Sequence, residues 1–541
     1  MNARALLAAL LLAISGAGHA ATQTVCTITV NSPDEREVFR RHLPGDRFEF
    51  VELVERGNPD WLGASCRKGV RCDVLLVSGH FAGTEFYSSR LQNDETLPVD
   101  VLERAACSDS CPGLFENLKE VYLFGCDTLN PTPVRVATPE VARTLVREGL
   151  GAAEASGAAR ALAQRHGESA HDHMRRLFSN VPVIYGFSSK APYGRVAGPL
   201  LERHFQSAGG EEIGTGHVSE RLRRLFAPAS MVVTTGQRDS DPNADYRAEV
   251  CRYHDMRVSS ATKLAGIHAM MGRSMADVRL SLDRIEKFMA GLSEAERVDP
   301  EFIAASRALA TDAGLRGRYL TLVRDTEDPA VRVRLIKLAR TLGWLRADEE
   351  RAETMRMVAD VLAGRAAGFG EVDLICGLNR DRSLDAEAHR LAGASIPPGR
   401  ASDAALACLG DSRSRARILG ALASRDEGDV QLAQAYLRHQ PIDDAGELRS
   451  VALDVARMDG SAAQARALET LARHHIADDA VLERLAAVFM QTRSLPVQRA
   501  IAEIFIRSNY RGAPGLGDRL RKHRLRSPDG ADLIDTLISR L

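Results

Sequence analysis

The chain has 541 residues, with 71 lysines and arginines against 72 aspartates and glutamates, and a formal net charge of −1. This length is too great for one hydrophobic core and predicts two or three domains. A near-neutral charge gives no reason to expect a nucleic acid or an anionic membrane surface as a partner. Charged residues make up 26% and hydrophobic residues 45% of the chain, as in ordinary globular proteins.

The first 20 residues predict a signal peptide. Arg4 supplies a positive charge, residues 5–14 form an apolar segment of ten residues, and Gly18 and Ala20 are the small residues that a signal peptidase reads. Ten apolar residues are too few to span a bilayer, which requires about 20, and no later apolar run reaches that length. We therefore expect an exported protein, periplasmic or secreted, without a membrane span.

The nine cysteines gain importance if the chain is exported, because an oxidising compartment permits disulfides. The candidates form two close pairs in loop-like segments, Cys66 with Cys72 and Cys107 with Cys111. Four more cysteines complete a set of eight: Cys26, Cys251, Cys376 and Cys408. Cys126 is left over, which makes it a candidate reactive thiol. The sequence does not determine the partners, and free buried thiols are an equally good interpretation of most of these cysteines.

Strand-like and helix-like segments alternate in the first half of the chain. Residues 48–54 alternate apolar and polar, as in a half-exposed edge strand, whereas residues 72–77 (CDVLLV) are typical of a strand covered on both faces. The other expected strands are residues 25–30, 118–124, 181–187 and 231–235, and the expected helices are 35–43, 97–106, 138–178 and 194–205. This alternation predicts an α/β domain over residues 21–250, with a mostly parallel sheet covered by helices on both faces.

Strand signals fade after about residue 255, and amphipathic helices follow. Apolar residues recur at spacings of three and four in residues 279–292, 299–309, 329–342, 352–363, 429–438, 446–458, 462–474, 479–490 and 495–509. Short turns join these segments, which predicts stacked antiparallel helix pairs, that is, an α-solenoid over residues 296–541 after a helical linker at 251–295. An irregular helical bundle is the alternative.

Two of these segments resemble HEAT repeats. Residues 325–343 (DTEDPAVRVRLIKLARTLG) open with Asp328 and Pro329 and continue with Val331, Arg332 and an apolar stripe, and residues 494–510 are similar. The resemblance implies a concave helical surface that binds a protein partner.

The chemistry candidates lie where two consecutive strands end. The apolar run 72–77 leads into Ser78, Gly79 and His80, and the run 118–124 leads into Gly125 and Cys126. One helix lies between the strands, and a right-handed crossover makes such strands parallel and often adjacent. His80 and Cys126 would then both project from the carboxyl edge of the sheet, where open α/β folds bind ligands. Because an imidazole can take the proton of a nearby thiol, we expect these two residues to form a catalytic dyad.

These motifs resemble those of the caspase–hemoglobinase superfamily of cysteine peptidases, which includes the CHAT-type members. VLLVSGH, residues 74–80, is similar to the apolar strand that ends in Ser-Gly-His-Gly, and GCDT, residues 125–128, is similar to the motif of a small residue, Cys, any residue and Ser or Thr. VPVIYGFSS, residues 181–189, is similar to the following strand, so the resemblance covers about residues 24–240.

The resemblance implies that Cys126 is the nucleophile and that His80 is the base and acid of the dyad. The backbone N–H groups of Cys126 and of a residue near Gly79 would stabilise the oxyanion, and Gly79 and Gly125 would support the turns. The chain departs from the family at Phe81, where the family has glycine, and at Leu129, where glycine often follows the cysteine motif.

The sequence thus predicts an exported caspase-like peptidase that hydrolyses a protein or peptide substrate without a cofactor. His166, His171 and His173 are spaced by five and two residues, so they diverge on a helix, and we expect no metal site there. The first alternative is a catalytically inactive caspase-like scaffold, which would bind proteins through the HEAT-like solenoid. A different hydrolase or an amidase-type transferase using the same thiol is the second.

Overall fold

The fold is described from a computed structural model of the chain. It describes residues 22–88, 95–107, 111, 113–132, 138–166, 169–241, 243–364, 367–391, 396–459, 462–526 and 532–541. The signal peptide predicted at residues 1–20 lies outside the described residues. The chain forms two compact units, of which the first runs to Arg318 and the second begins at Tyr319.

A six-stranded sheet is the centre of the first unit. Its strand order is β2-β1-β3-β7-β8-β9, and every neighbouring pair is parallel except β8 and β9, which are antiparallel. The strands are β1 Gln23–Thr29, β2 Phe48–Glu52, β3 Val74–Ser78, β7 Glu120–Phe124, β8 Val183–Phe187 and β9 Met231–Thr234. The mostly parallel sheet is confirmed, and β2 lies at an edge, as its alternating pattern predicts.

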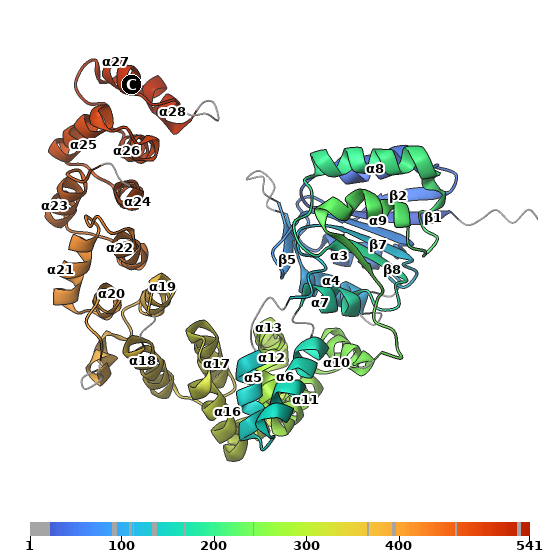
Figure 1. The fold of residues 1–541 in the computed structure, drawn as a ribbon. Helices are drawn as coiled ribbons and strands as arrows, with labels where there is room; N and C mark the ends of the chain where they lie inside the picture. Colours follow the sequence, from blue (N-terminus) through green and yellow to red (C-terminus); the bar gives the residue numbers. More distant parts are fainter. Residues whose placement is uncertain are drawn as a thin grey trace, which may run out of the picture. The chain divides into compact units, whose positions relative to one another are not determined.

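Helices cover both faces of this sheet because its strands are apolar on both sides (Figure 1). On β3, Leu75 and Val77 join the core formed with α3, α4 and α7, whereas Val74 and Leu76 join the core formed with α2, α8 and α9. These helices are α2 Asp34–His42, α3 Trp61–Arg67, α4 Val99–Ala106, α7 Ala170–Leu177, α8 Gly194–Ala208 and α9 Glu220–Phe226.

A second, three-stranded sheet follows directly after β3, and the sequence did not predict it. It has the order β4-β5-β6 and is antiparallel. Its strands are β4 His80–Phe81, β5 Glu85–Tyr87 and β6 Thr96–Pro98. His80 therefore lies in a short strand of its own rather than in a free loop.

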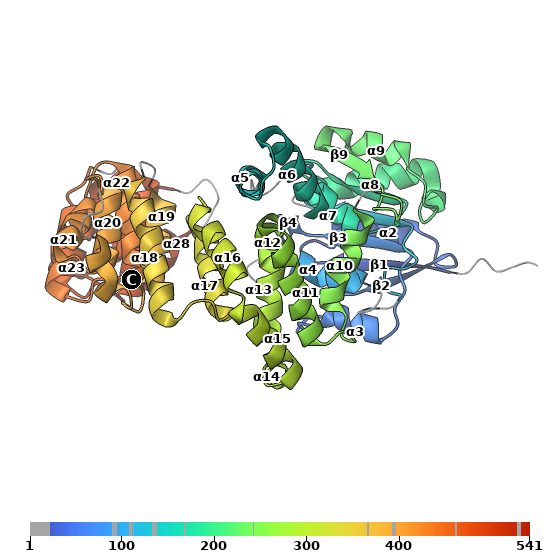
Figure 2. The ribbon, with the colours of Figure 1, turned by 90° about the horizontal axis from the view of Figure 1, so that it is seen from below.

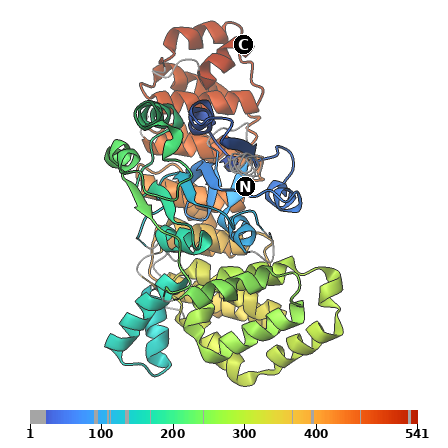
Figure 3. The same ribbon diagram turned by 90° about the vertical axis from the view of Figure 1, so that its right-hand side faces the viewer.

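The rest of the first unit is helical. The single helical tract expected at residues 138–178 consists of α5 Thr138–Arg147, α6 Ala152–His166 and α7. Gly149, between α5 and α6, has a φ of +107°, which an L-residue rarely adopts, so the first helix ends there. The remaining helices are α10 Ala244–His254, α11 Ser260–Arg273, α12 Met275–Leu280, α13 Leu282–Gly291, α14 Glu294–Arg297, α15 Pro300–Thr311 and α16 Ala313–Asp325, which spans the division between the units. Helices α5 and α6 pack against α12 (Figures 2 and 3).

Eight of the nine cysteines form disulfides. The bonds join Cys26 to Cys72, Cys66 to Cys111, Cys107 to Cys251 and Cys376 to Cys408. All four cysteines of the two close pairs are therefore oxidised, namely Cys66, Cys72, Cys107 and Cys111. None of them is bonded to its neighbour in the pair. Four disulfides fit the oxidising environment that export provides. Among the helices that the structure describes, none has the length and apolar character needed to cross a membrane.

The second unit is entirely helical within its described residues. Its helices after α16 are α17 Pro329–Thr341, α18 Ala347–Ala363, α19 Phe369–Leu378, α20 Arg400–Cys408, α21 Ser412–Ala421, α22 Glu427–His439, α23 Ala445–Val455, α24 Ala462–Leu471, α25 Asp479–Gln491, α26 Leu495–Arg507, α27 Leu516–His523 and α28 Leu533–Arg540. They pack on near neighbours in the chain: α22 on α24, α24 on α26 and α26 on α28. Figure 1 shows them following one another from olive to red. The predicted all-helical C-terminal region is confirmed.

Candidate active site

His80 and Cys126 follow two strands that are hydrogen-bonded neighbours. Strands β3 and β7 are parallel, with Ser78 opposite Phe124. The Gly79 N–H continues the pairing by donating to the carbonyl oxygen of Phe124 at 3.3 Å. His80 and Cys126 each come two residues after this last pair, so the structure brings the two predicted residues to the same edge of the sheet.

Gly125 allows the two strand ends to approach each other closely. A Cβ atom on Gly125 would lie 2.9 Å from the carbonyl oxygen of Gly79 and 3.1 Å from the Cβ atom of Phe81. Approaches this short force a neighbour to move, and here the nearest atom belongs to the backbone. A glycine is therefore needed immediately before Cys126, whereas Gly79 is less constrained, because its added Cβ would lie 3.2 Å from Val30.

The turn that carries Cys126 is fixed to the end of β8. Asp127 has a φ of +57° and donates its N–H to the carbonyl oxygen of Ser189 at 2.7 Å, and the Leu129 N–H donates to Phe187 at 2.9 Å. The Thr128 hydroxyl accepts the Phe187 N–H and donates to the carbonyl oxygen of Gly125, both at 3.1 Å. A left-handed residue directly after the cysteine is uncommon outside glycine and makes the turn sharp.

Cys126 is the free cysteine of the chain, and its side chain is half-buried. The Ala191 N–H donates to its sulfur at 3.3 Å. Among the described residues, nothing accepts a hydrogen bond from the Cys126 N–H. That group is free to donate to an oxyanion formed next to the sulfur.

His80 lies between two exposed tyrosines. Its imidazole is 5.4 Å from the ring of Tyr87, its partner in the β4–β5 pair, and 6.1 Å from the ring of Tyr193, which follows β8. Tyr193 is 63% exposed and Tyr87 is 36% exposed. These rings offer two apolar walls beside the imidazole to a bound chain.

Asn31 is a site residue that the sequence analysis missed. Its side-chain nitrogen lies 3.4 Å from Nε2 of His80, and its side-chain oxygen accepts the Ser88 hydroxyl at 3.2 Å. Asn31 follows β1, which pairs with β3, so it reaches the same edge of the sheet. The signal was a polar residue directly after an apolar strand, a feature too common to single it out.

The contact with Asn31 involves Nε2 of His80, whose role as donor or acceptor depends on the tautomer of the ring. In the structure the Asn31 amide nitrogen faces Nε2, and the amide oxygen accepts the Ser88 hydroxyl. For Nδ1 to act as a base, Nε2 must carry the proton, and Asn31 must then turn its amide oxygen toward Nε2.

Phe81 and Leu129, the departures from the family pattern, are both core residues. Phe81 is 8% exposed and packs its ring 4.8 Å from that of Phe86, in the core beneath the small sheet. Leu129 is buried against Gly186. Neither side chain is exposed in front of His80, and Phe81 instead supports the strand that holds it.

The histidines of residues 166–173 have separate partners. His166 contacts Tyr246 and Asp277, His171 contacts Thr234, and His173 lies beside Glu103. Within the described part of the chain, no group of three or more His, Cys, Asp or Glu side chains is arranged to hold a metal ion.

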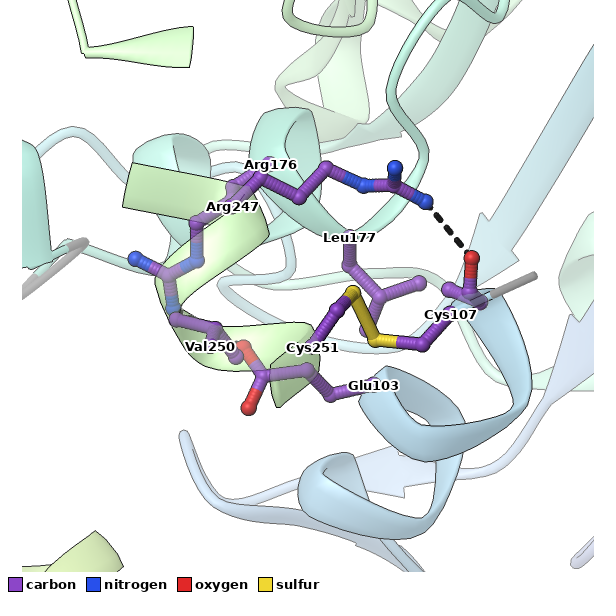
Figure 4. A pocket seen from close by; sticks show the side chains of 8 residues that line it. Glu103, Cys107, Arg176, Leu177, Arg247, Val250 and Cys251 are labelled. Carbon is purple, nitrogen blue, oxygen red and sulfur yellow. Dashed lines mark hydrogen bonds and ion pairs between the residues drawn. A yellow bond between two sulfur atoms is a disulfide. The ribbon is translucent and has the colours of Figure 1, made fainter. Parts of the chain in front are cut away.

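The small hollow in Figure 4 belongs to the core under α4 and not to the dyad. Arg176 forms an ion pair with Glu103 at 3.1 Å, and the disulfide between Cys107 and Cys251 also lines this hollow (Figure 4). Burial alone would raise the pKa of Glu103, but His173, Arg176 and Arg284 together lower it well below its usual value. This charged group therefore stabilises the packing of α4, α7 and α10.

Comparison of the chain with protein-family models, with curated proteins and with solved structures found no match in any of the three. The geometry of the carboxyl edge is therefore the basis for assigning a function.

Proposed function

We propose that this protein is an exported cysteine peptidase with a caspase-like α/β domain, in which Cys126 is the nucleophile and His80 the general base and acid. One observation carries the proposal. Of nine cysteines, all within the described residues, the one left free follows β7 at the carboxyl edge of the sheet, and His80 follows the adjacent strand β3. In a chain whose other cysteines are all oxidised, a free thiol at the strand end next to the one that leads into His80 suits chemistry better than packing.

The reaction would proceed through a thioester. His80 takes the thiol proton, and the Cys126 sulfur attacks the carbonyl carbon of the peptide bond, forming a C–S bond and an oxyanion. The Cys126 N–H donates to that oxyanion. The C–N bond then breaks as His80 protonates the leaving amine, and water hydrolyses the thioester with His80 again as base.

The surroundings of the dyad support a peptide as the substrate. Tyr87 and Tyr193 provide apolar surface beside His80, and the Ala191 N–H and the Cys126 N–H provide donors beside the sulfur. Asn31 holds the imidazole through Nε2. An extended chain lying along the edge of the sheet would meet all of these groups.

We further propose that the second unit is a HEAT-like helical array that binds a protein partner. The support is its packing, in which helices contact near neighbours along the chain, as in a solenoid. In the alternative, a catalytically inactive scaffold, this unit would be the working surface and Cys126 would have no enhanced reactivity.

Iodoacetamide labelling of the intact protein at neutral pH separates the two possibilities. We expect Cys126 to react at least about tenfold faster than free cysteine, because a thiolate, not a thiol, attacks the reagent. Cys126→Ala should abolish labelling, and both Cys126→Ala and His80→Ala should abolish peptide hydrolysis. His217→Ala, at an exposed histidine in the loop before α9, is the matched control. A labelling rate equal to that of free cysteine and unchanged in His80→Ala, with peptide hydrolysis unaffected by either variant, would rule out the peptidase.

A further inference from the structure

Glu35 is a buried carboxyl group directly beneath the candidate site. It lies in the first turn of α2 and is 3% exposed. Its Oε2 atom is 2.9 Å from the hydroxyl of Ser78, the last residue of β3 and two residues before His80. Among the described residues, no lysine, arginine or histidine forms an ion pair with Glu35. Burying an ionised carboxylate without a cation costs free energy, so another interaction must account for the burial of Glu35.

The hydrogen bonds of Ser78 require a proton on Glu35. The Ser78 hydroxyl oxygen lies 2.9 Å from Oε2 of Glu35 and 2.9 Å from the carbonyl oxygen of Ser32. A hydroxyl has one hydrogen and can donate to only one of two acceptors. Both bonds exist together only when the carboxyl O–H donates to Ser78 and Ser78 donates to Ser32.

The charges around Glu35 favour the same protonated form. Burial raises its pKa, its hydrogen bonds with the Glu35 N–H and the Ser78 hydroxyl lower it, and the Asp34 carboxylate on the same helix raises it, which leaves the pKa at about 7. Strand β3 contributes the Ser78 hydroxyl. Helix α8 packs against α2, but its carboxylate Glu202 pairs with Arg41 and His42 at the other end of α2.

The bonds of Ser78 connect the two segments that hold His80. The Val30 and Asn31 N–H groups donate to the carbonyl oxygen of Ser78 at 2.9 and 3.2 Å, and Ser32 accepts its hydroxyl. The turn after β1 is thereby tied to the end of β3 by main chain and side chain. Asn31, in that turn, touches Nε2 of His80.

We propose that protonated Glu35 is a positioning residue for His80: it completes a Glu35–Ser78–Ser32 chain of hydrogen bonds that holds Asn31 against the imidazole. When Glu35 loses its proton, Ser78 turns its single hydrogen to the carboxylate, and the Ser32 carbonyl loses its bond. The turn with Asn31 is then held less firmly, so His80 activates Cys126 less well. This inference rests on the proposed dyad, and it concerns the regulation of that dyad by pH.

The test is the rate of alkylation of Cys126 by iodoacetamide in the intact protein between pH 5 and 9, compared at each pH between the natural protein and Glu35→Gln. The two rates should agree at pH 5. Above neutral pH the natural protein should react about threefold to tenfold more slowly than Glu35→Gln, the effect of losing one hydrogen bond, because the amide of the variant donates to Ser78 at every pH. Thiolate absorbance, measured against Cys126→Ala, should show the same difference as a smaller thiolate fraction.

Two further variants keep the test decisive. Ser78→Ala breaks the chain of hydrogen bonds but leaves Glu35 in place, so the alkylation rate should be lower than that of Glu35→Gln at every pH. Glu37→Gln, a more exposed glutamate of the same helix, should leave the profile unchanged. If Glu35→Gln keeps the natural profile while His80→Ala lowers the rate, the dyad stands and the role of Glu35 is wrong. If His80→Ala does not lower the rate, both proposals are wrong.

Discussion

The carbonyl oxygen of Gly79 lies 2.9 Å from the position that a Cβ atom on Gly125 would occupy. The strand ends that carry His80 and Cys126 are therefore in direct backbone contact, with no room for a methyl group between them. The position of the thiol relative to the imidazole depends on this contact.

Gly125→Ala adds only one methyl group, but it should destabilise the fold and slow the reaction of Cys126. The methyl group must displace either the Gly79 backbone or Phe81, which we expect to cost about 1–3 kcal/mol of unfolding free energy. It should also lower the alkylation rate of Cys126 at least about tenfold, a loss of about 1.4 kcal/mol of activation. Gly266→Ala is the matched control, because that helical glycine has nothing within 4 Å of an added Cβ. Equal behaviour of the two variants in thermal unfolding and in labelling would contradict the close contact.

Asn31→Ala should weaken His80 as a base without unfolding the chain. The variant removes the contact at Nε2, and the loss of one hydrogen bond to the imidazole should slow alkylation of Cys126 about threefold to tenfold. Asn58→Ala, in the turn before α3, removes a hydrogen bond to Glu55 and should leave the rate unchanged. An Asn31→Ala rate equal to that of Asn58→Ala would show that Asn31 does not orient His80.

The disulfide between Cys376 and Cys408 should stabilise the second unit and not the site. It closes a segment with a sequence separation of 32 residues and joins α19 to α20. Replacing both cysteines by alanine should lower the unfolding free energy of that unit by about 4 kcal/mol, by the chain-entropy estimate. Denaturant unfolding followed by limited proteolysis measures the change. A slower alkylation of Cys126 in this variant would be unexpected, since both cysteines lie in the second unit.

His166 should make the first unit less stable in acid. Burial lowers its pKa to about 4, although Asp277 acts in the opposite direction. Between pH 4 and the ordinary value of 6.5, the unfolded chain binds the proton and the folded chain does not, so stability falls as pH falls. The full difference corresponds to about 3 kcal/mol. Urea unfolding at pH 7.5 and pH 4.5 should show a smaller drop for His166→Gln than for the natural chain; an equal drop would contradict this assignment.

Glu35 should contribute with the opposite sign. Its pKa in the folded chain is about 7, above the ordinary value of 4.5, so the folded state holds a proton that the unfolded chain has already lost. Its contribution to stability is complete below pH 4.5 and is lost as the pH rises through 7. Unfolding measured at pH 5 and pH 8 should therefore show a decrease for the natural chain that Glu35→Gln lacks. The same decrease in both would mean that another group titrates.

The long elements could be predicted from the sequence because their apolar patterns are strong. The run around Leu75 and Val77 predicts a strand covered on both faces, and its neighbour at 118–124 follows from the crossover rule. The short strands β4, β5 and β6 could not be predicted, because two or three residues show no periodicity.

The details of the site could not be predicted from the sequence. Asn31 is 49 residues from His80 in the chain, and no local pattern connects them. The sequence could not show that Phe81 lies in the core, because a residue after a strand can turn its side chain either way. The partners of Cys66 and Cys107 were equally undetermined, since disulfide connectivity depends on the folded positions of all eight cysteines. The odd number of cysteines did require one to stay unpaired, and the structure confirms the predicted one, Cys126.

The most direct measurement is the second-order rate constant of iodoacetamide with Cys126 at pH 7, compared between the natural chain, His80→Ala and His217→Ala. The proposed dyad predicts that the natural chain and His217→Ala react at the same rate, at least about tenfold faster than free cysteine and than His80→Ala. Equal rates for all three proteins, no faster than free cysteine, would contradict it.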